Sequence, residues 1–506
     1  MTRFPRTIIL ILALLITACS SPPGKEIKDI KHTASVQFNS SDPELNEAWK
    51  WARETALSYV RTGDVVGPWY EAALPGRDAF CMRDVSHQST GAAALGLDDE
   101  NKNMLFRFAE NISESRDWCS YWEINKDNVP APVDYESDKD FWYNLPANFD
   151  VIDACFRMYL WTGDNTYITD PIFLNFYQNT LINYVERWEL SADKIMGRDR
   201  IMNLPEGATP DNHKYYDKRG IPGYHEGAGG KMQLGVDLLA VQYAANSWYH
   251  HYMSDDPRFS MWLDEANKVE ALIKDVFWDE EKGKFNLIMY QDGSFGHSVG
   301  NGADFSYALL HYKALDDPRM IQSILDTYSN NKEGFIIEIA SHLPHIFFRN
   351  GRSEDGIFML KYLTNSTTDR REYPENPFSV VGAFVTGLMG VTAEAPNNLI
   401  STFSGMKAPY MQTKIADLPV MGKKIDLLHR GRHTSMMHNH SDTPIYWTPY
   451  LEGWQDVWYI NGKEETGYGK ATKHFGINVT SFLIKVEPHT RVSVSQYPPP
   501  EQEDAE

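Results

Sequence analysis

The chain carries the segment Pro75-Gly-Arg-Asp-Ala-Phe-Cys-Met-Arg-Asp-Val-Ser-His-Gln88 directly before a run of small residues, Thr90-Gly-Ala-Ala-Ala-Leu-Gly-Leu97, that predicts a helix. Guanidinium groups donate paired, directional hydrogen bonds, and carboxylates accept from neighbouring hydroxyl groups. Because aromatic side chains alternate with these charges, we interpret the segment as a surface for a polyhydroxylated ligand rather than as solvated ion pairs. The expected ligand-binding residues are Trp69, Arg77, Asp78, Arg83, Asp84, His87 and Gln88.

The first 18 residues have the pattern of an export signal. Arg3 and Arg6 precede a short apolar run, and small residues precede Cys19. The apolar run is too short to cross a bilayer comfortably as a helix. Ile16-Thr-Ala-Cys19 resembles a bacterial lipoprotein box, which implies lipidation of Cys19 and a lipid anchor in the outer membrane of a Gram-negative bacterium, on its periplasmic or outer side. A plain secretory peptide is the alternative. We expect a signal peptide at 1–18 and a tether at 19–39.

Composition restricts the partners. The chain has 48 basic and 69 acidic residues, a formal charge of −21, so it repels phosphate backbones and nucleic acid is not an expected partner. Its 14 Trp and 27 Tyr favour an ordered chain and contact with carbohydrate, because sugars stack their C–H faces on such rings. The spacing of Cys81, Cys119 and Cys155 fits neither a disulfide framework nor a zinc site. We expect buried thiols, with one disulfide among them left open.

Two regions differ in periodicity. Residues 40–395 show repeated amphipathic patterns separated by uneven loops, which predict a toroid of helical hairpins with its long loops gathered at one end. Residues 396–497 alternate with period two and contain the turn signal Asn461-Gly462, which predicts a smaller β-sandwich or sheet domain. The acidic, proline-rich end at 498–506 is predicted to be disordered. The expected fold class is mainly α.

Helical hairpins, a short β domain, a lipoprotein-like leader and an Arg-Asp segment after the first helix together resemble the six-hairpin glycosidase superfamily. This superfamily includes trehalases, processing α-glucosidases and the catalytic domains of α-L-rhamnosidases. The resemblance covers residues from about 40 to 490 and does not place the chain in one family. It implies an (α/α)6 barrel and inverting hydrolysis by a general acid and a general base, whose carboxyl groups stand about 6.5–9.5 Å apart. No cofactor is implied.

One carboxyl cluster is Asn203-Leu-Pro-Glu206-Gly-Ala-Thr-Pro-Asp211-Asn212, followed by Val236-Asp-Leu-Leu-Ala240. Its order and spacing are similar to the segment that carries the general acid in trehalases and glucosidases, with one residue inserted between the Glu and the Asp. The resemblance therefore implies Asp211 as the acid, with Glu206 second and Glu226 third. Ordinary turn chemistry is the alternative for Asp211.

A second cluster is Arg370-Arg-Glu372-Tyr-Pro-Glu375-Asn-Pro377, directly before the last expected barrel helix. In the superfamily the general base generally lies there, so the resemblance implies Glu372 or Glu375. Nearby arginines favour the ionised form that a base requires. Glu338 is a weaker candidate, and a loop of local ion pairs is the non-catalytic alternative.

Other residues complete the expected site. Trp122, Trp142 and Tyr224 are candidates for the walls of a sugar site, with Glu226 beside them. His438 and His440 alternate on one predicted strand, but we expect no metal there.

The expected function is exo-acting, inverting glycoside hydrolysis of oligosaccharides or polysaccharides. Two alternatives remain: a polysaccharide lyase or unsaturated-uronide hydrolase on a similar toroid, and a non-catalytic glycan-binding lipoprotein. The lyase would use cations to neutralise a uronate, and the binding protein would need neither acid nor base.

Overall fold

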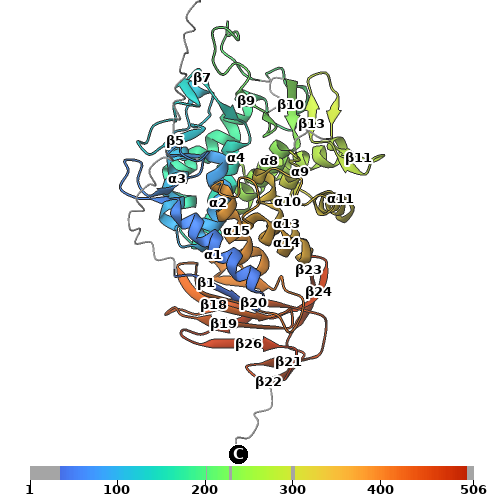
Figure 1. The fold of residues 1–506 in the computed structure, drawn as a ribbon. Coiled ribbons are helices and arrows are strands. Elements are labelled where there is room, and N and C mark those ends of the chain that lie inside the picture. The colour runs from blue at the N-terminus through green and yellow to red at the C-terminus, as the bar shows by residue number, and fades with distance from the viewer. Residues whose placement is uncertain (1–34, 201, 227–230, 298–301, 499–506) are drawn as a thin grey trace, which may run out of the picture. The chain divides into compact units, whose positions relative to one another are not determined.

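The computed structural model describes residues 35–200, 202–226, 231–297 and 302–498. The predicted signal peptide, Cys19, most of the tether and residues 499–506 lie outside these ranges. Among the described residues, no helix combines the length and the apolar character needed to cross a membrane. Helices fill the first part of the described chain, and strands form its C-terminal part (Figure 1).

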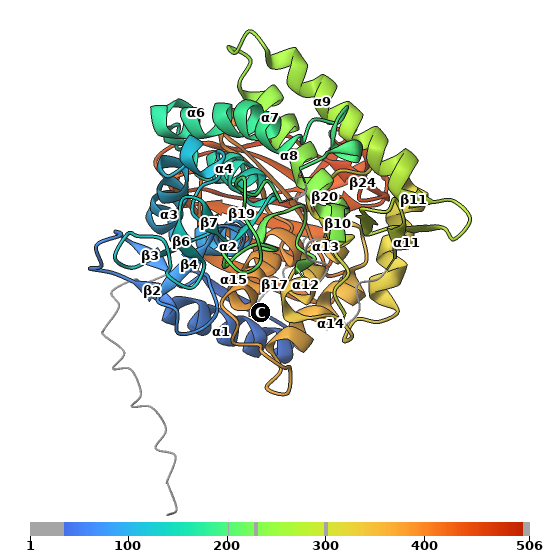
Figure 2. The same cartoon turned by 90° about the horizontal axis from the view of Figure 1, so that it is seen from above.

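The helices form two concentric rings (Figure 2). The outer ring contains α1 (Pro43–Ser58), α3 (Asp98–Glu110), α6 (Pro171–Gln178), α9 (Phe259–Leu272), α11 (Pro318–Ser329) and α14 (Ser353–Thr364). The inner ring contains α2 (Met82–Ala94), α4 (Ala147–Thr162), α8 (Val236–Tyr252), α10 (Tyr307–His311), α13 (Leu343–Arg349) and α15 (Glu375–Gly382), which continues into η6 (Ala383–Leu388). Inner helices contact their neighbours in the order α15, α2, α4, α8, α10, α13, and α13 contacts η6. The ring is therefore closed, and the predicted helical toroid is confirmed.

Local sequence explains the helix starts and the closeness of the inner ring. The Asp42 carboxylate caps α1 by accepting from the Glu44 amide, and Asp317 caps α11 in the same way. A Pro follows each cap at the first helical position, where its missing N–H is not needed. Gly91 on α2 faces α15 so closely that a Cβ atom would lie 1.8 Å from the carbonyl oxygen of Phe378. Only glycine permits this approach.

Two sheets form the C-terminal part. The larger has the order β1 (Gln37–Ser40), β17 (Gln412–Val420), β18 (Lys423–Arg430), β19 (Thr434–Asn439), β26 (Arg491–Ser495), β21 (Val457–Ile460) and β22 (Lys463–Thr466). The smaller has the order β15 (Thr392–Glu394), β16 (Leu399–Phe403), β20 (Ile445–Glu452), β24 (Ile477–Ser481) and β23 (Lys470–His474), with β25 (Ile484–Val486) paired to β20. Asn461 and Gly462, both at positive φ, join β21 to β22 as the turn signal predicted.

The sheets differ from the predicted boundaries at two points. Residues 37–39, assigned to the tether, belong to β1, which pairs antiparallel with β17. β15 begins at Thr392, so strand structure starts slightly before residue 396. The partner of β1 lies far along the chain, which local composition does not reveal, whereas β15 pairs antiparallel with the next strand, β16.

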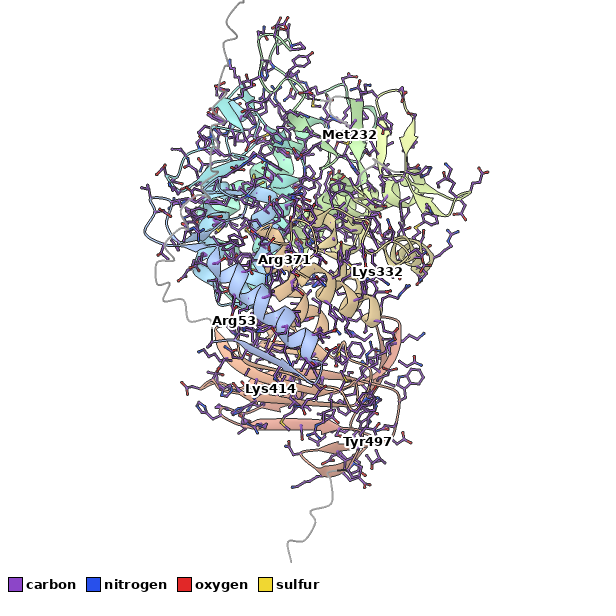
Figure 3. The ribbon with its side chains drawn as sticks, viewed as in Figure 1. Arg53, Met232, Lys332, Arg371, Lys414 and Tyr497 are labelled. Atoms are coloured by element: carbon purple, nitrogen blue, oxygen red, sulfur yellow. The ribbon has the colours of Figure 1, made fainter. Side chains whose placement is uncertain are left out.

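Short strands lie at the end of the toroid opposite the two sheets. They include β4 (Ala79–Cys81) paired with β5 (Glu123–Asn125), and β10 (Met232–Gly235) paired with β13 (Ile288–Tyr290). Figure 3 shows Met232 among these strands at one end and Lys414 of β17 in the sheet at the other. The thiols of Cys81, Cys119 and Cys155 are free and buried, as expected.

Candidate active site

A cavity of about 280 Å³, here called the front cavity, lies at the end of the toroid where the inner helices begin. Every inner helix is preceded by a segment that contributes to its wall. The contributors are Arg77 before α2, Trp142 before α4, Tyr224 before α8, Phe305 before α10, Glu338 before α13 and Tyr373 before α15. Side chains distant in sequence therefore meet around one space, as in most ligand sites.

One wall contains two carboxyl groups joined by Arg77. Its Nη1 lies 2.8 Å from Glu123 Oε2 and 3.3 Å from Asp134 Oδ2. Glu123 is only 2% exposed and sits on β5, opposite the strand inside the Arg-Asp segment. Burial and the charge of Asp134 raise the pKa of Glu123 to about 7, although Arg77 lowers it. Glu123 can therefore give up or take a proton near neutral pH.

Arg83 and Asp84 are neighbouring residues that also line the front cavity. Arg83 Nη2 lies 3.7 Å from Asp84 Oδ1 and 3.9 Å from Glu375 Oε2, so two carboxyl groups share its charge. Burial raises the pKa of Asp84 to about 6; Arg83 opposes this shift and Glu375 adds to it. The Tyr373 hydroxyl donates to Asp84, and Arg83 lies over the Tyr224 ring, 5.2 Å from its centroid.

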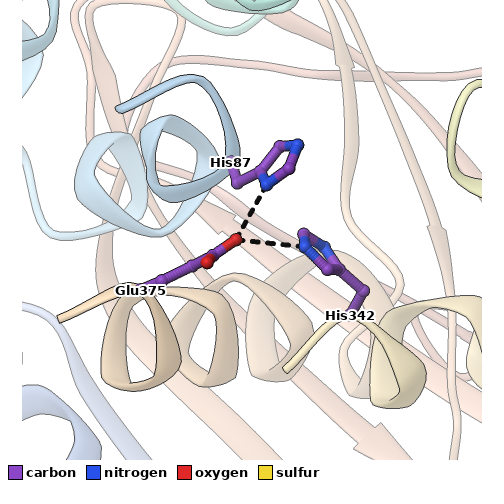
Figure 4. Close-up of side chains that lie close together, drawn as sticks. All are labelled: His87, His342 and Glu375. Atoms are coloured by element: carbon purple, nitrogen blue, oxygen red, sulfur yellow. Dashed lines mark hydrogen bonds and ion pairs between the residues drawn. The ribbon is translucent and has the colours of Figure 1, made fainter. Parts of the chain in front are cut away.

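Behind this layer, Glu375 is held between two histidines (Figure 4). Its Oε1 lies 2.7 Å from His87 Nδ1 on α2 and 3.1 Å from His342 Nε2 just before α13. Burial alone would raise the pKa of Glu375, but hydrogen bonds from His342 and His87 and the charge of Arg83 hold it well below its usual range. Burial and His342 lower the pKa of His87 to about 4, so the ring is neutral. This cluster connects α2, the residue directly before α13 and the first residue of α15.

Two further carboxyl groups line the front cavity. Glu338 Oε1 lies 2.7 Å from Arg370 Nη2, whereas its Oε2 is buried and has no hydrogen-bond partner among the described residues. Glu226 Oε1 accepts from Asn144 Nδ2 at 3.1 Å. Glu338 thus has one oxygen held by Arg370 and one oxygen without a partner among the described residues.

The structure brings together seven of the expected site residues. Those lining the front cavity are Arg77, Arg83, Asp84, Trp122, Trp142, Tyr224 and Glu226. The segments 203–226 and 370–377 do meet there, but through Tyr224, Glu226 and Tyr373.

The carboxyl groups ranked first from the sequence lie elsewhere. Glu206 and Asp211 are exposed in a loop of turns, and Glu372 is exposed and paired with Arg371 at 2.7 Å. None of the three is among the residues described as lining the front cavity. Glu375 lies behind the cavity, fully buried. The tertiary structure sets which side chains of each segment face the front cavity.

The remaining expected binding residues also lie outside the front cavity. Trp69 is buried in the core, and its Nε1 donates to Asp64 Oδ2 at 2.8 Å. Asp78 pairs with Lys126 Nζ at 3.1 Å on the surface. His87 forms a hydrogen bond with Glu375, and Gln88 is fully buried within α2.

Four polar or aromatic residues of the wall were not expected from the sequence. Asp134 carries no signal in the sequence around it. Glu123 directly follows the aromatic run ending at Trp122, which could have indicated it. Phe305 and Tyr373 precede inner helices, so knowledge of the ring order would have been needed to place them.

Among the described residues, two side-chain clusters have spacings that a metal ion could bridge. They are His87 with His342 and Glu375, and Asp426 with His438 and His440 in the sheet region. In the first, His87 Nδ1 and His342 Nε2 both form hydrogen bonds with Glu375 Oε1. In the second, His440 Nε2 lies 2.9 Å from Asp426 Oδ1.

Comparisons with known proteins support the fold. No family model matches the chain, and no curated protein matches its sequence. An α-L-rhamnosidase from Dictyoglumus thermophilum superposes with a TM-score of 0.59 at 11% identity, over 91% of this chain and 50% of that one. The chain therefore shares the fold of that rhamnosidase, a closed ring of helical hairpins with a β domain. A sialidase (TM-score 0.54, 11% identity, 91% and 41% covered) and a GH78-family rhamnosidase from Bacillus sp. GL1 (TM-score 0.50, 14% identity, 80% and 40% covered) also match.

This chain spans half or less of the length of those three structures. What it shares with them is the helical toroid and the β domain. The chemistry of its site follows from its own residues.

Proposed function

We propose that this protein is a glycoside hydrolase in which Glu123 is the general acid and Glu338 the general base. The observation that carries the proposal is one cavity holding both a carboxyl group with a pKa of about 7 and a carboxylate with one free oxygen. An inverting glycosidase needs these two properties on opposite sides of a sugar.

In the proposed reaction, a water molecule bound to Glu338 Oε2 attacks the anomeric carbon. Glu338 takes a proton from the water while Glu123 gives its proton to the glycosidic oxygen. The anomeric C–O bond breaks, a new C–O bond to the water oxygen forms on the other face, and the configuration inverts. Arg370 holds the base in place, and Arg77 holds the acid.

The small front cavity supports exo action on a terminal sugar, with Trp122 and Trp142 available to stack on its ring. Its described lining has five carboxyl groups and two guanidinium groups, both engaged in ion pairs. This excess of negative charge favours a neutral sugar. It also argues against the lyase and uronide-hydrolase alternatives, which need free cations for a carboxylate substrate.

A panel of neutral aryl glycosides, α and β, tests the proposal. Glu123→Gln and Glu338→Gln should each lower kcat by about 10²–10⁴, the usual contribution of a general acid or base. The exposed Asp211→Asn and Glu372→Gln variants are the matched controls and should keep nearly full activity. If these controls lose activity while Glu123→Gln and Glu338→Gln keep it, the proposal is wrong. The general acid and general base would then be the residues first expected from the sequence. NMR of the first product shows whether the anomer is inverted.

The proposed setting is a lipid anchor at Cys19 in the outer membrane. The lipoprotein-box resemblance supports it. Labelling with a radioactive fatty acid should mark the wild-type chain and not Cys19→Ala, and label in both would reject the anchor.

A further inference from the structure

A second cavity of about 390 Å³, here called the rear cavity, lies where the inner helices end. Arg157 comes from the C-terminal half of α4 and Trp248 from that of α8. Arg349 is the last residue of α13, and Lys313 follows the end of α10 by two residues. No residue described as lining this cavity lines the front cavity. The two cavities therefore lie toward opposite ends of the ring.

The described lining of the rear cavity contains three strongly basic side chains, Arg157, Lys313 and Arg349, and one carboxylate, Asp153. Both oxygens of Asp153 are engaged. Arg157 Nε donates to Oδ2 at 2.7 Å, and Trp248 Nε1 donates to Oδ1 at 2.7 Å. The single carboxylate is thus committed to Arg157 and Trp248, and the positive charge of the cavity exceeds its negative charge.

Arg157 itself is fully bonded. Its Nη1 donates to Ser89 Oγ at 3.1 Å and Thr90 Oγ1 at 2.8 Å, and its Nη2 donates to the Ser86 carbonyl at 2.7 Å. These bonds fasten α4 to α2. Arg157 has a structural role and little capacity left for a ligand.

Lys313 and Arg349 differ from Arg157, because neither side chain has a hydrogen bond or ion pair with any described residue. The charge of Arg349 lowers the pKa of Lys313 to about 8. Burial and the charge of Arg157 lower the pKa of Arg349 to about 10. The cations therefore repel one another at close range. Lys313 is exposed, so the cavity is open to solvent beside it.

Helix ends do not account for both cations. The carbonyl ends of α10 and α13 attract positive charge, which favours a basic residue there. That attraction supplies no hydrogen-bond acceptor to either side chain and does not remove their repulsion. An anion between them would do both.

The wall of the rear cavity also offers an aromatic surface. Trp248 and Tyr252 are stacked with their centroids 5.9 Å apart, and both line the cavity. A flat or sugar-like ring can pack on such a surface while its charged group reaches the cations.

We propose that the rear cavity binds a small sugar acid, with its oxyanion held by Lys313 and Arg349 and its ring packed on the Trp248–Tyr252 wall. Guanidinium and ammonium groups together suit a carboxylate, sulfate or phosphate group. This inference does not depend on the proposed hydrolysis.

Isothermal titration calorimetry of the full chain with D-glucuronate tests the proposal, with D-glucose as the uncharged probe. We expect saturable binding of one glucuronate per chain and none of glucose. Lys313→Met and Arg349→Met should each weaken binding at least tenfold. Lys463→Met on the exposed strand β22 is the surface control, and Arg77→Met in the front cavity is the second control. Both should bind glucuronate like the wild type.

Thermal unfolding without ligand separates a lost site from a misfolded chain. Because each variant removes repulsion, Lys313→Met and Arg349→Met should melt at or above the wild-type temperature. Titrations with inorganic sulfate and phosphate show which oxyanion the cations prefer, and either of them competing with glucuronate supports the proposal. Three outcomes would overturn it: no saturable binding of glucuronate, binding of chloride alone, or binding that Arg77→Met abolishes and Lys313→Met leaves intact.

Discussion

Replacing Asp134 by Asn should move the alkaline limb of the pH–activity profile to lower pH. In the wild type, burial and the negative charge of Asp134 keep the pKa of Glu123 raised to about 7. Asparagine removes that charge, so Glu123 becomes the only carboxylate that pairs with Arg77 Nη1. Both changes favour the ionised form of Glu123, so its pKa falls. As the proposed general acid must be protonated, activity is then lost at a lower pH.

The contacts bound the size of this shift. Glu123 and Asp134 share Arg77 Nη1, at 2.8 Å and 3.3 Å. Their nearest oxygens are therefore at most about 6 Å apart, where a unit charge is worth about 2.8 kcal/mol at an effective dielectric constant of about 20, or about two pKa units. Water in the open cavity screens part of this energy. We expect a displacement of about one to two pH units.

The assay is kcat/KM against pH, because this ratio reports the pKa values of the free enzyme. Asp78→Asn is the matched control, since it removes a carboxylate next to Arg77 that faces Lys126 at the surface. Its profile should match that of the wild type. An alkaline limb that stays in place in Asp134→Asn, or moves to higher pH, would refute the assignment of Glu123 as the acid.

Two further predictions concern stability. Gly91→Ala should destabilise the fold by at least about 3 kcal/mol in urea unfolding, because the new Cβ would collide with the Phe378 carbonyl, whereas Gly197→Ala, with open space around it, should change little. Glu375→Gln should lower the free energy of unfolding by about 2–3 kcal/mol at pH 7, since it removes a charged acceptor shared by two buried histidines. Because the folded pKa of Glu375 is depressed, its advantage over Gln should hold above pH 4.5, its ordinary value, and shrink as the pH falls below that. A gap between the two proteins that does not depend on pH would contradict this explanation.

Much of the fold could be predicted from sequence because its signals are local. Helix caps such as Asp317-Pro318 and the turn Asn461-Gly462 act within a few residues. Amphipathic spacing over 40–395 already implied hairpins. By contrast, β1 joins a sheet whose next strand lies more than 370 residues away, and no local property marks such a partner.

The site was predicted less completely. Arg77, Arg83 and Asp84 were found because aromatic and charged residues alternate around them. The acid and base were inferred from a family resemblance in residue order and spacing, yet spacing does not determine which side chain of a segment points inward. Glu123 acquires its raised pKa from burial and from Asp134, which lies on a separate segment.

The sequence by itself determined the helical hairpins, the strand-rich C-terminal part and the segment that supplies the arginines of the front cavity. Only the tertiary structure decided which carboxyl groups share the front cavity and which cations face the rear cavity with no partner for their side chains among the described residues. The physical reason is that helices and turns arise from interactions within a few residues. Burial, charge proximity and pKa depend on side chains that the closed ring brings together from all six hairpins.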